Sequence, residues 1–164
     1  MSRIKLATAW LSGCSGCHMG ILNLHGGLME LFQLCDLVYS PLADFKEYPA
    51  EVDIALIEGA ISNRDNLEMA RIIRRYTKKV VSLGDCAING NVAALRNPGG
   101  KAAVLEAAYA DPVNKPVVFG ECVPPLFDKV LPLHQVIPVD AFIPGCPPEP
   151  EAIRVALHRV IERL

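Results

Sequence analysis

The stretch Ser12-Gly-Cys-Ser-Gly-Cys-His-Met-Gly20 is the part of the sequence that most clearly indicates the fold. It stands between an apolar run over residues 4–11 and a helical pattern over residues 21–32. A turn that leads from a parallel strand into a helix is where open α/β sheets place their ligands. The three glycines of the stretch lack Cβ atoms, so the backbone can turn tightly and approach a bulky group. The stretch therefore predicts a ligand-binding turn whose ligating groups are the thiols of Cys14 and Cys17.

Length, composition and charge narrow the class of protein. The 164 residues predict one domain, residues 1–164, long enough to bury a core without disulfide bonds. Hydrophobic residues make up 51% of the chain, yet no apolar run approaches the roughly 20 residues that a membrane-spanning helix needs. A net charge of -2 without a long Lys/Arg run argues against nucleic acid as a partner. The apolar excess indicates a buried parallel sheet, a large partner interface, or both.

The first residues enter a strand pattern without the features of a signal peptide or a twin-arginine export sequence. We therefore expect a cytoplasmic protein. In a reducing compartment, cysteines serve as metal ligands or buried thiols more often than in disulfide bonds. This expectation applies to all six cysteines of the chain.

Alternating strand and helix patterns predict an α/β fold. Strands are expected over residues 4–10, 35–39, 51–58, 79–83 and 136–143, and helices over residues 19–34, 66–76, 101–109 and 149–164. The proline-rich residues 113–133 stay apolar and predict an irregular covering segment before the last strand and helix. This order predicts a flavodoxin-like parallel sheet with helices on both faces and right-handed connections.

Cysteines follow three of the predicted strands: Cys14 and Cys17 the first, Cys86 the fourth and Cys146 the last. Parallel strands bring their carboxyl ends to one edge of a sheet, so these four thiols are expected to meet there. Structural zinc is usually held by two local pairs, whereas here one pair is joined by two single cysteines. The spacing therefore favours one 4Fe-4S cluster over zinc. A redox-active or chance Cys-x-x-Cys pair is the third interpretation.

Two cysteines lie outside this pattern. Cys35 begins an apolar strand and is expected to be a buried thiol. Cys122, in Gly-Glu-Cys-Val-Pro-Pro, follows no clear strand and is the alternative ligand in place of Cys146.

Four motifs, spread from end to end of the chain, resemble the small subunit of NiFe hydrogenases. They are Trp10-Leu-Ser-Gly-Cys-Ser-Gly-Cys-His18, Ile57-Glu-Gly-Ala60, Gly84-Asp-Cys86 with Gly90, and Pro144-Gly-Cys-Pro-Pro148. The resemblance is nearest to the short small subunit of cytoplasmic NAD-reducing (bidirectional) hydrogenases. It implies a flavodoxin-like fold in which Cys14, Cys17, Cys86 and Cys146 hold the proximal 4Fe-4S cluster.

The resemblance also implies partners and a reaction. The cluster of such a subunit lies beside the NiFe centre of a large subunit. It passes electrons between that centre and diaphorase subunits, which carry FMN and iron-sulfur clusters and reduce NAD. The chain is then one subunit of an H2:NAD+ oxidoreductase whose NiFe site lies in a partner, because its single Cys-x-x-Cys pair is already assigned. Longer family members hold two further clusters, for whose cysteines this sequence has no counterparts.

Two acidic residues near the predicted cysteine edge are candidates for further roles. The resemblance puts Glu58 beside the cluster and the large subunit, where a carboxylate can pass the protons released by hydrogen cleavage. The plainer interpretation of Glu58 is a helix-capping or solvent-facing acid. Asp85 stands where many relatives carry Thr or Ser. It is expected either to lower the reduction potential of the cluster or to cap a following turn.

Other functions stay open from the sequence. A flavodoxin-like subunit can bind FMN at its first turn, but such loops favour Ser and Thr hydroxyls around the phosphate, and this loop places Cys14 and Cys17 there. The chain can also be the small subunit of a NiFe hydrogenase with an acceptor other than NAD. A metal-stabilised scaffold without a redox role is the last alternative.

Overall fold

Five parallel strands form the main sheet of the computed structural model, which describes residues 3–109 and 123–164. In chain order they are β1 (Ile4–Trp10), β2 (Cys35–Tyr39), β3 (Val52–Glu58), β5 (Thr77–Leu83) and β7 (Ala141–Ile143). They lie side by side in the order β2-β1-β3-β5-β7. Counted along the chain, this is the order 2-1-3-4-5 of flavodoxin-like sheets, so the predicted fold class is confirmed.

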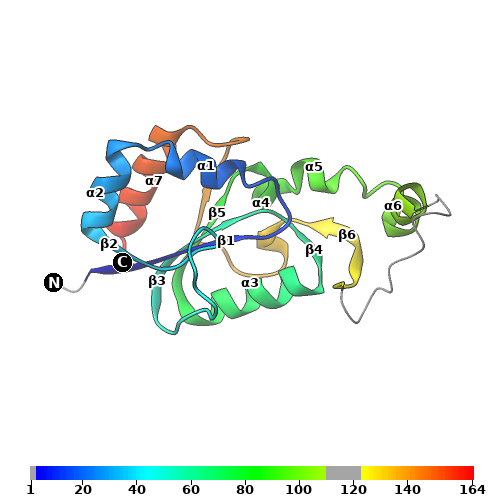
Figure 1. The fold of residues 1–164 in the computed structure, drawn as a ribbon, viewed down its shortest axis with the longest axis horizontal. Helices are drawn as coiled ribbons and strands as arrows, with labels where there is room; N and C mark the ends of the chain where they lie inside the picture. The colour runs from blue at the N-terminus through cyan, green and yellow to red at the C-terminus, as the bar shows by residue number, and fades with distance from the viewer. Residues whose placement is uncertain (1–2, 110–122) are drawn as a thin grey trace.

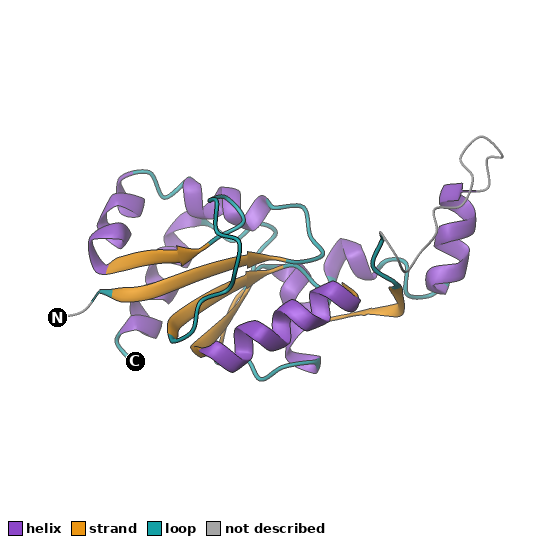
Figure 2. Cartoon of the chain, turned by 60° about the horizontal axis from the view of Figure 1, so that its bottom comes forward, coloured by secondary structure: helices purple, strands orange, loops and turns teal. Residues whose placement is uncertain are grey.

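Helices cover both faces of this sheet (Figure 1; Figure 2). On one face lie α1 (Gly16–Leu22), α2 (Gly26–Leu34) and α7 (Pro150–Ile161), and on the other lie α3 (Arg64–Tyr76) and α4 (Asp85–Asn89). In the central strand β3, Ile54 and Leu56 are buried in the first layer, whereas Ala55 and Ile57 are buried in the second. Successive side chains of a strand point to opposite faces, so a strand that is apolar throughout needs cover on both.

The single helix expected over residues 19–34 is wrong, because the structure has two helices there. α1 ends at Leu22, α2 begins at Gly26, and His25 between them has φ 48°. The pair Gly26-Gly27 has little intrinsic preference for a helix, which allows the chain to change direction at this point. After the change, Leu31 of α2 packs into the core.

The proline-rich region differs from the prediction in its described part. Residues 113–122 lie outside the described residues, but Leu126–Leu131 is a strand, β6, which pairs antiparallel with β4 (Ile61–Asn63). An irregular segment is therefore the wrong interpretation of these residues. The six residues of β6 contain no proline, and prolines stand only on either side of them, at Pro125 and Pro132. Pairing with a strand so far away in the chain leaves no local pattern.

The last strand is shorter than the predicted residues 136–143. Pro138 has no amide N–H to give to a sheet, and the residues just before the predicted strand form a 3-10 helix, η1 (Leu133–Gln135). Pairing with β5 starts at Asp140, whose N donates to Val80 O (2.8 Å). The other helices are α5 (Asn91–Ala94), which the sequence pattern does not predict, and α6 (Gly100–Tyr109), which it does. Within the described ranges, every helix is too short or too polar to cross a membrane.

Candidate functional site

The cysteine turn after β1 is fastened to the segment that follows β3. Ser12 N donates to Ala60 O (3.0 Å), and Ala60 N donates to Ser12 O (2.8 Å). Before the cysteines, the Trp10 indole N–H donates to Gly13 O (3.1 Å). The Cys-x-x-Cys pair therefore begins from a fixed point at the carboxyl edge of the sheet.

The two cysteines of the turn have different surroundings, and their charges interact with those of the two single cysteines. Cys14 is exposed, whereas Cys17 lies in the first turn of α1 and is 6% exposed. Burial raises the pKa of Cys17 to about 12, and negative charge on Glu58, Cys86, Cys14 and Cys146 contributes to the rise. The pKa of Cys86 is also raised, by burial first and then by charge on Cys14 and Cys146. The four thiols therefore lie close enough to one another to interact.

The end of β5 closes directly on Cys17. Gly84 follows β5 with φ 79°, and a Cβ atom on Gly84 would lie 2.2 Å from Cys17 Sγ. Both the left-handed backbone and the short distance require glycine at this position. The start of α4, which carries Cys86, is thus brought against the start of α1, which carries Cys17.

The start of α4, which carries Cys86, and the loop after β7, which carries Cys146, are bonded to each other. Asp85 N donates to Gly145 O (2.9 Å), and Gly145 N donates to Asp85 Oδ1 (2.8 Å). We call these two bonds the Asp85–Gly145 clamp. Asp85 is thus a backbone cap, but it caps the loop after β7 rather than the turn that follows it in the sequence. Because each clamp residue adjoins a cysteine, the clamp limits how far apart Cys86 and Cys146 can lie.

Asn91, which the sequence pattern does not single out, contacts these same two cysteines. Its Nδ2 donates to Cys146 Sγ (3.2 Å). A hydrogen bond from its side chain to Cys86 lowers the pKa of that thiol and so opposes part of the rise that burial causes. Asn91 follows Gly90 and has φ 36°. The Gly-Asn pair indicates a left-handed backbone, but contact with a sulfur 55 residues away leaves no signal in the sequence.

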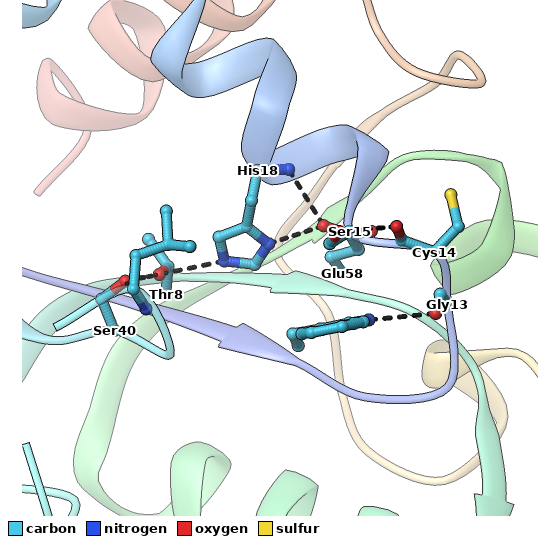
Figure 3. A network of polar contacts seen from close by, with 9 residues as sticks. Thr8, Gly13, Cys14, Ser15, His18, Ser40 and Glu58 are labelled. Atoms are coloured by element: carbon cyan, nitrogen blue, oxygen red, sulfur yellow. Dashed lines mark hydrogen bonds and ion pairs between the residues drawn. The ribbon is translucent and has the colours of Figure 1, made fainter. Parts of the chain in front are cut away.

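Glu58 is buried behind the cysteine turn at 1% exposure, so the interpretation as a solvent-facing acid is wrong (Figure 3). Its Oε2 accepts from His18 N (3.0 Å) and lies 2.5 Å from His18 Nδ1. Glu58 therefore caps the first turn of α1 from a neighbouring strand, as the capping interpretation predicts. Beyond the imidazole, His18 Nε2 lies 3.1 Å from Thr8 Oγ1, which donates to Ser40 Oγ (2.9 Å). We call Glu58, His18, Thr8 and Ser40 the buried polar chain.

The structure separates Cys35 from the four thiols. Cys35 starts β2 at the opposite end of the sheet, is 1% exposed in the core and has its pKa raised by burial, as expected of a buried thiol. Cys122, the alternative ligand, lies outside the described residues. Over residues 3–109 and 123–164, no three His, Cys, Asp or Glu side chains converge as the ligands of a single metal ion do.

Large apolar side chains are exposed on the elements that carry or adjoin the cysteines. Trp10 at the end of β1 is 47% exposed and Met19 on α1 is 52% exposed. Val92 on α5 and Leu95 after it are 66% and 76% exposed. We call these four residues the apolar rim. A partner that docks at the cysteine edge would cover these side chains.

The sequence profile of a known family covers most of the chain. The family is described as "NADH ubiquinone oxidoreductase, 20 Kd subunit", and its profile matches residues 14–160, which include the four edge cysteines. The chain belongs to this family. Its resemblance to the small subunits of NiFe hydrogenases is confirmed by the relatives and the solved structure described next.

Two curated relatives in this family are hydrogenase subunits. One, from the F420-non-reducing hydrogenase of Methanothermobacter marburgensis, is 41% identical over 153 residues, which are 89% of this chain and 49% of the relative. The other, NAD-reducing hydrogenase HoxS subunit delta of Cupriavidus necator, is 37% identical over 165 residues, which are 97% of this chain and 79% of the relative. This chain spans about half the length of several subunits of F420-non-reducing hydrogenases that it matches.

Solved structures of hydrogenases contain the same fold. A chain of an NAD+-reducing NiFe-hydrogenase in the H2-reduced state matches with a TM-score of 0.92 and 38% identity, over 99% of this chain and 94% of that one. A chain of the NiFeSe hydrogenase of Desulfovibrio vulgaris Hildenborough matches with a TM-score of 0.61 over 98% of this chain and 59% of that one. At 16% identity, the second match supports only the fold of this chain and nothing about its function.

Proposed function

We propose that this chain is the electron-transfer small subunit of a NiFe hydrogenase, and that residues 1–164 form one domain holding one 4Fe-4S cluster. The proposed ligands are Cys14, Cys17, Cys86 and Cys146. The observation that carries the proposal is the interaction of these thiols: charge on the other three contributes to the raised pKa of Cys17, and charge on Cys14 and Cys146 contributes to that of Cys86. A relative in Archaeoglobus profundus, named as the iron-sulfur subunit of an F420-non-reducing hydrogenase, also supports a cluster.

The donor set fits a cluster of several irons. Thiols that raise one another's pKa need a positive centre to offset the repulsion between their deprotonated forms. In a four-iron cluster each thiolate binds a different iron, so the sulfurs spread more widely than around one zinc ion, which holds each sulfur at about 2.3 Å. When bound, such a cluster supplies a group that accepts and releases one electron.

The chain's own residues hold these sulfurs in three segments. The turn after β1 and the first turn of α1 carry two of them, the start of α4 carries the third, and the loop after β7 carries the fourth. The Asp85–Gly145 clamp ties the last two segments together. Glu58 fixes the start of α1 through His18, the residue after Cys17. The role of Glu58 in proton transfer stays a prediction.

The apolar rim supports a partner at the cysteine edge. We propose that the hydrogenase large subunit, with its NiFe centre, covers this rim and exchanges electrons with the cluster. The similarity to the NAD-reducing HoxS subunit delta and to a chain of an NAD+-reducing hydrogenase supports NAD as the final acceptor, reached through diaphorase subunits that carry FMN and iron-sulfur clusters. A cytoplasmic location goes with this proposal.

A second candidate is a NiFe hydrogenase small subunit with another acceptor. The similarity to the Methanothermobacter relative from an F420-non-reducing hydrogenase, at 41% identity, favours it over the remaining alternatives. Both candidates share the cluster and the large subunit and differ only in where the electrons go. FMN on this chain stays an untested alternative.

The test is anaerobic purification of the native complex through a tag on this chain. We expect about four irons and four acid-labile sulfides per copy of this chain beyond those of its partners, a reducible EPR signal, and a nickel-containing large subunit. Zinc without sulfide would refute the cluster. Hydrogen-dependent reduction of NAD supports the first candidate, whereas reduction of ferredoxin but not of NAD supports the second. Stoichiometric FMN on the separated chain would restore the flavin alternative.

A further inference from the structure

Asn91, the first residue of α5, reaches the cysteine edge with its backbone held in an uncommon conformation. Its φ of 36° lies in the left-handed region, which Asn adopts more readily than most residues. Asn89 Oδ1 accepts from Asn91 N (2.8 Å), and Gly90 N donates to Cys86 O (3.0 Å). The junction of α4 and α5 at Gly90 is thus anchored to the backbone of Cys86, which fixes the direction of the Asn91 side chain.

The amide of Asn91 bonds the two single cysteines. Nδ2 donates to Cys146 Sγ at 3.2 Å, and a side-chain hydrogen bond joins Asn91 to Cys86. An Asn amide nitrogen carries two N–H groups, so one nitrogen can serve two sulfurs. These bonds strengthen when the sulfurs are deprotonated, because a charged acceptor forms a shorter and stronger hydrogen bond.

A donor in this position acts on the electron affinity of whatever the two sulfurs ligate. When a cluster is reduced, it gains one electron, and part of the added negative charge falls on its thiolate ligands. An N–H group directed at such a thiolate stabilises the more negative state and so raises the reduction potential. Asp85 adjoins Cys86 from the other side, but its Oδ1 already accepts from Gly145 N.

We propose that Asn91 tunes the reduction potential of the cluster: its amide donates to the thiolates of Cys146 and Cys86 and makes the bound cluster easier to reduce. This inference rests on the proposed function, since it needs a cluster on these cysteines. Asn91 is a positioning residue rather than a ligand. Its effect is therefore on the potential and not on the number of irons bound.

The test compares Asn91→Gly, Asn91→Asp and the control Asn89→Asp in the native complex. Gly accepts the left-handed backbone and removes only the amide, so no strain is added. Asp keeps the size of the side chain and replaces the donor with a carboxylate. Asn89→Asp adds the same charge two residues away and keeps the Oδ1 that accepts from Asn91 N. The readouts are iron content and the midpoint potential of this cluster from an EPR-monitored titration.

We expect all variants to keep the iron content of the wild type. The midpoint should become more negative in Asn91→Gly, still more negative in Asn91→Asp, and stay near the wild-type value in Asn89→Asp. An unchanged midpoint in Asn91→Gly would overturn the inference, as would loss of iron from both Asn91 variants. Absence of a reducible cluster from the wild type would instead overturn the proposed function, so the two failures are distinguishable.

Discussion

Cys14 and Cys17 are held by a local turn, whereas Cys86 and Cys146 are held by bonds between segments far apart in the sequence. We call these the local pair and the distant pair. The local pair follows one strand, and its turn is fastened by the reciprocal bonds of Ser12 and Ala60. The distant pair comes together only when β7 joins β5, where the Asp85–Gly145 clamp then forms. One half of the site thus depends on a turn and the other on the completed sheet.

The two pairs also differ in what lies behind them. The local pair is backed by the buried polar chain, in which Glu58 and His18 are 1% and 2% exposed. The distant pair is flanked by Asp85 and Asn91, both partly exposed. Changes behind the local pair should therefore act mainly on folding. Changes beside the distant pair should act mainly on the electron affinity of the proposed cluster.

Replacing a ligand tests both pairs with the largest effect. We expect Cys17→Ser and Cys86→Ser each to lower the iron bound by this chain, counted beyond that of its partners, more than about tenfold, since each removes a thiolate that no neighbour replaces. The control is Cys35→Ala, because Cys35 is buried at the opposite end of the sheet. Iron analysis of purified complexes checks this. Full iron in Cys86→Ser would show that the distant pair is not part of the site.

The contact between the two pairs is tested by Gly84→Ala. A Cβ atom at 2.2 Å from Cys17 Sγ and an unfavourable φ of 79° should lower the free energy of unfolding by about 2–4 kcal/mol and reduce iron content. Gly26→Ala is the matched control, because a Cβ atom there meets nothing within 4 Å. Denaturant unfolding of the chain measures the stability of both variants, and iron analysis measures the iron that they bind. Equal stability of the two variants would contradict the close packing of Gly84 on Cys17.

The support behind the local pair is tested by Glu58→Gln. The amide oxygen can still accept from His18 N, but the charge is lost, so the free energy of unfolding should fall by about 1–3 kcal/mol. If Glu58 also passes protons, hydrogen turnover should fall by at least about tenfold at unchanged iron content. Glu68→Gln, on α3, is the control. Unchanged turnover in Glu58→Gln would remove the proton-transfer role and leave the capping role.

The smallest effects are expected at Asp85. Asp85→Asn keeps an oxygen for Gly145 N and removes one negative charge beside Cys86, so the midpoint potential should become slightly less negative at full iron content. Asp85→Ala removes the side-chain bond of the clamp and should lower the free energy of unfolding by about 1 kcal/mol. The comparison of Asn with Ala separates charge from geometry. Identical midpoint potentials in Asp85→Asn and the wild type would show that the charge of Asp85 has no effect on the cluster and that its role is the bond of the clamp.

The sheet and the local pair are predictable because their signals are local. The apolar strands ending at Trp10 and Leu83, with cysteines shortly after each, indicate a parallel sheet and its ligand edge without any long-range knowledge. The helix break at His25 has a local signal in Gly26-Gly27, but Leu28 and Leu31 continue the apolar pattern across it, so the pattern alone predicts one helix. Periodicity reports which face is buried and does not report where the helix axis turns.

The contacts that complete the site are not predictable in the same way. The pairing of β4 with β6, the bond from Asn91 to Cys146 and the Asp85–Gly145 clamp all join residues that are distant in the chain. Glu58 shows an intermediate case. Its place at the end of a strand is visible in the sequence, but its burial follows from the path of α1 over it, which brings His18 within 2.5 Å.

The place of β7 at the edge of the sheet sets an order on biosynthesis. Its three residues pair only with β5 in the described sheet, and the fourth sulfur, that of Cys146, follows it. A ribosome must therefore deliver the polypeptide through Cys146 before all four sulfurs can gather. If these four cysteines hold the proposed cluster, iron loading follows the synthesis of this sheet rather than accompanying it, and the four apolar side chains of the rim are exposed until a partner covers them.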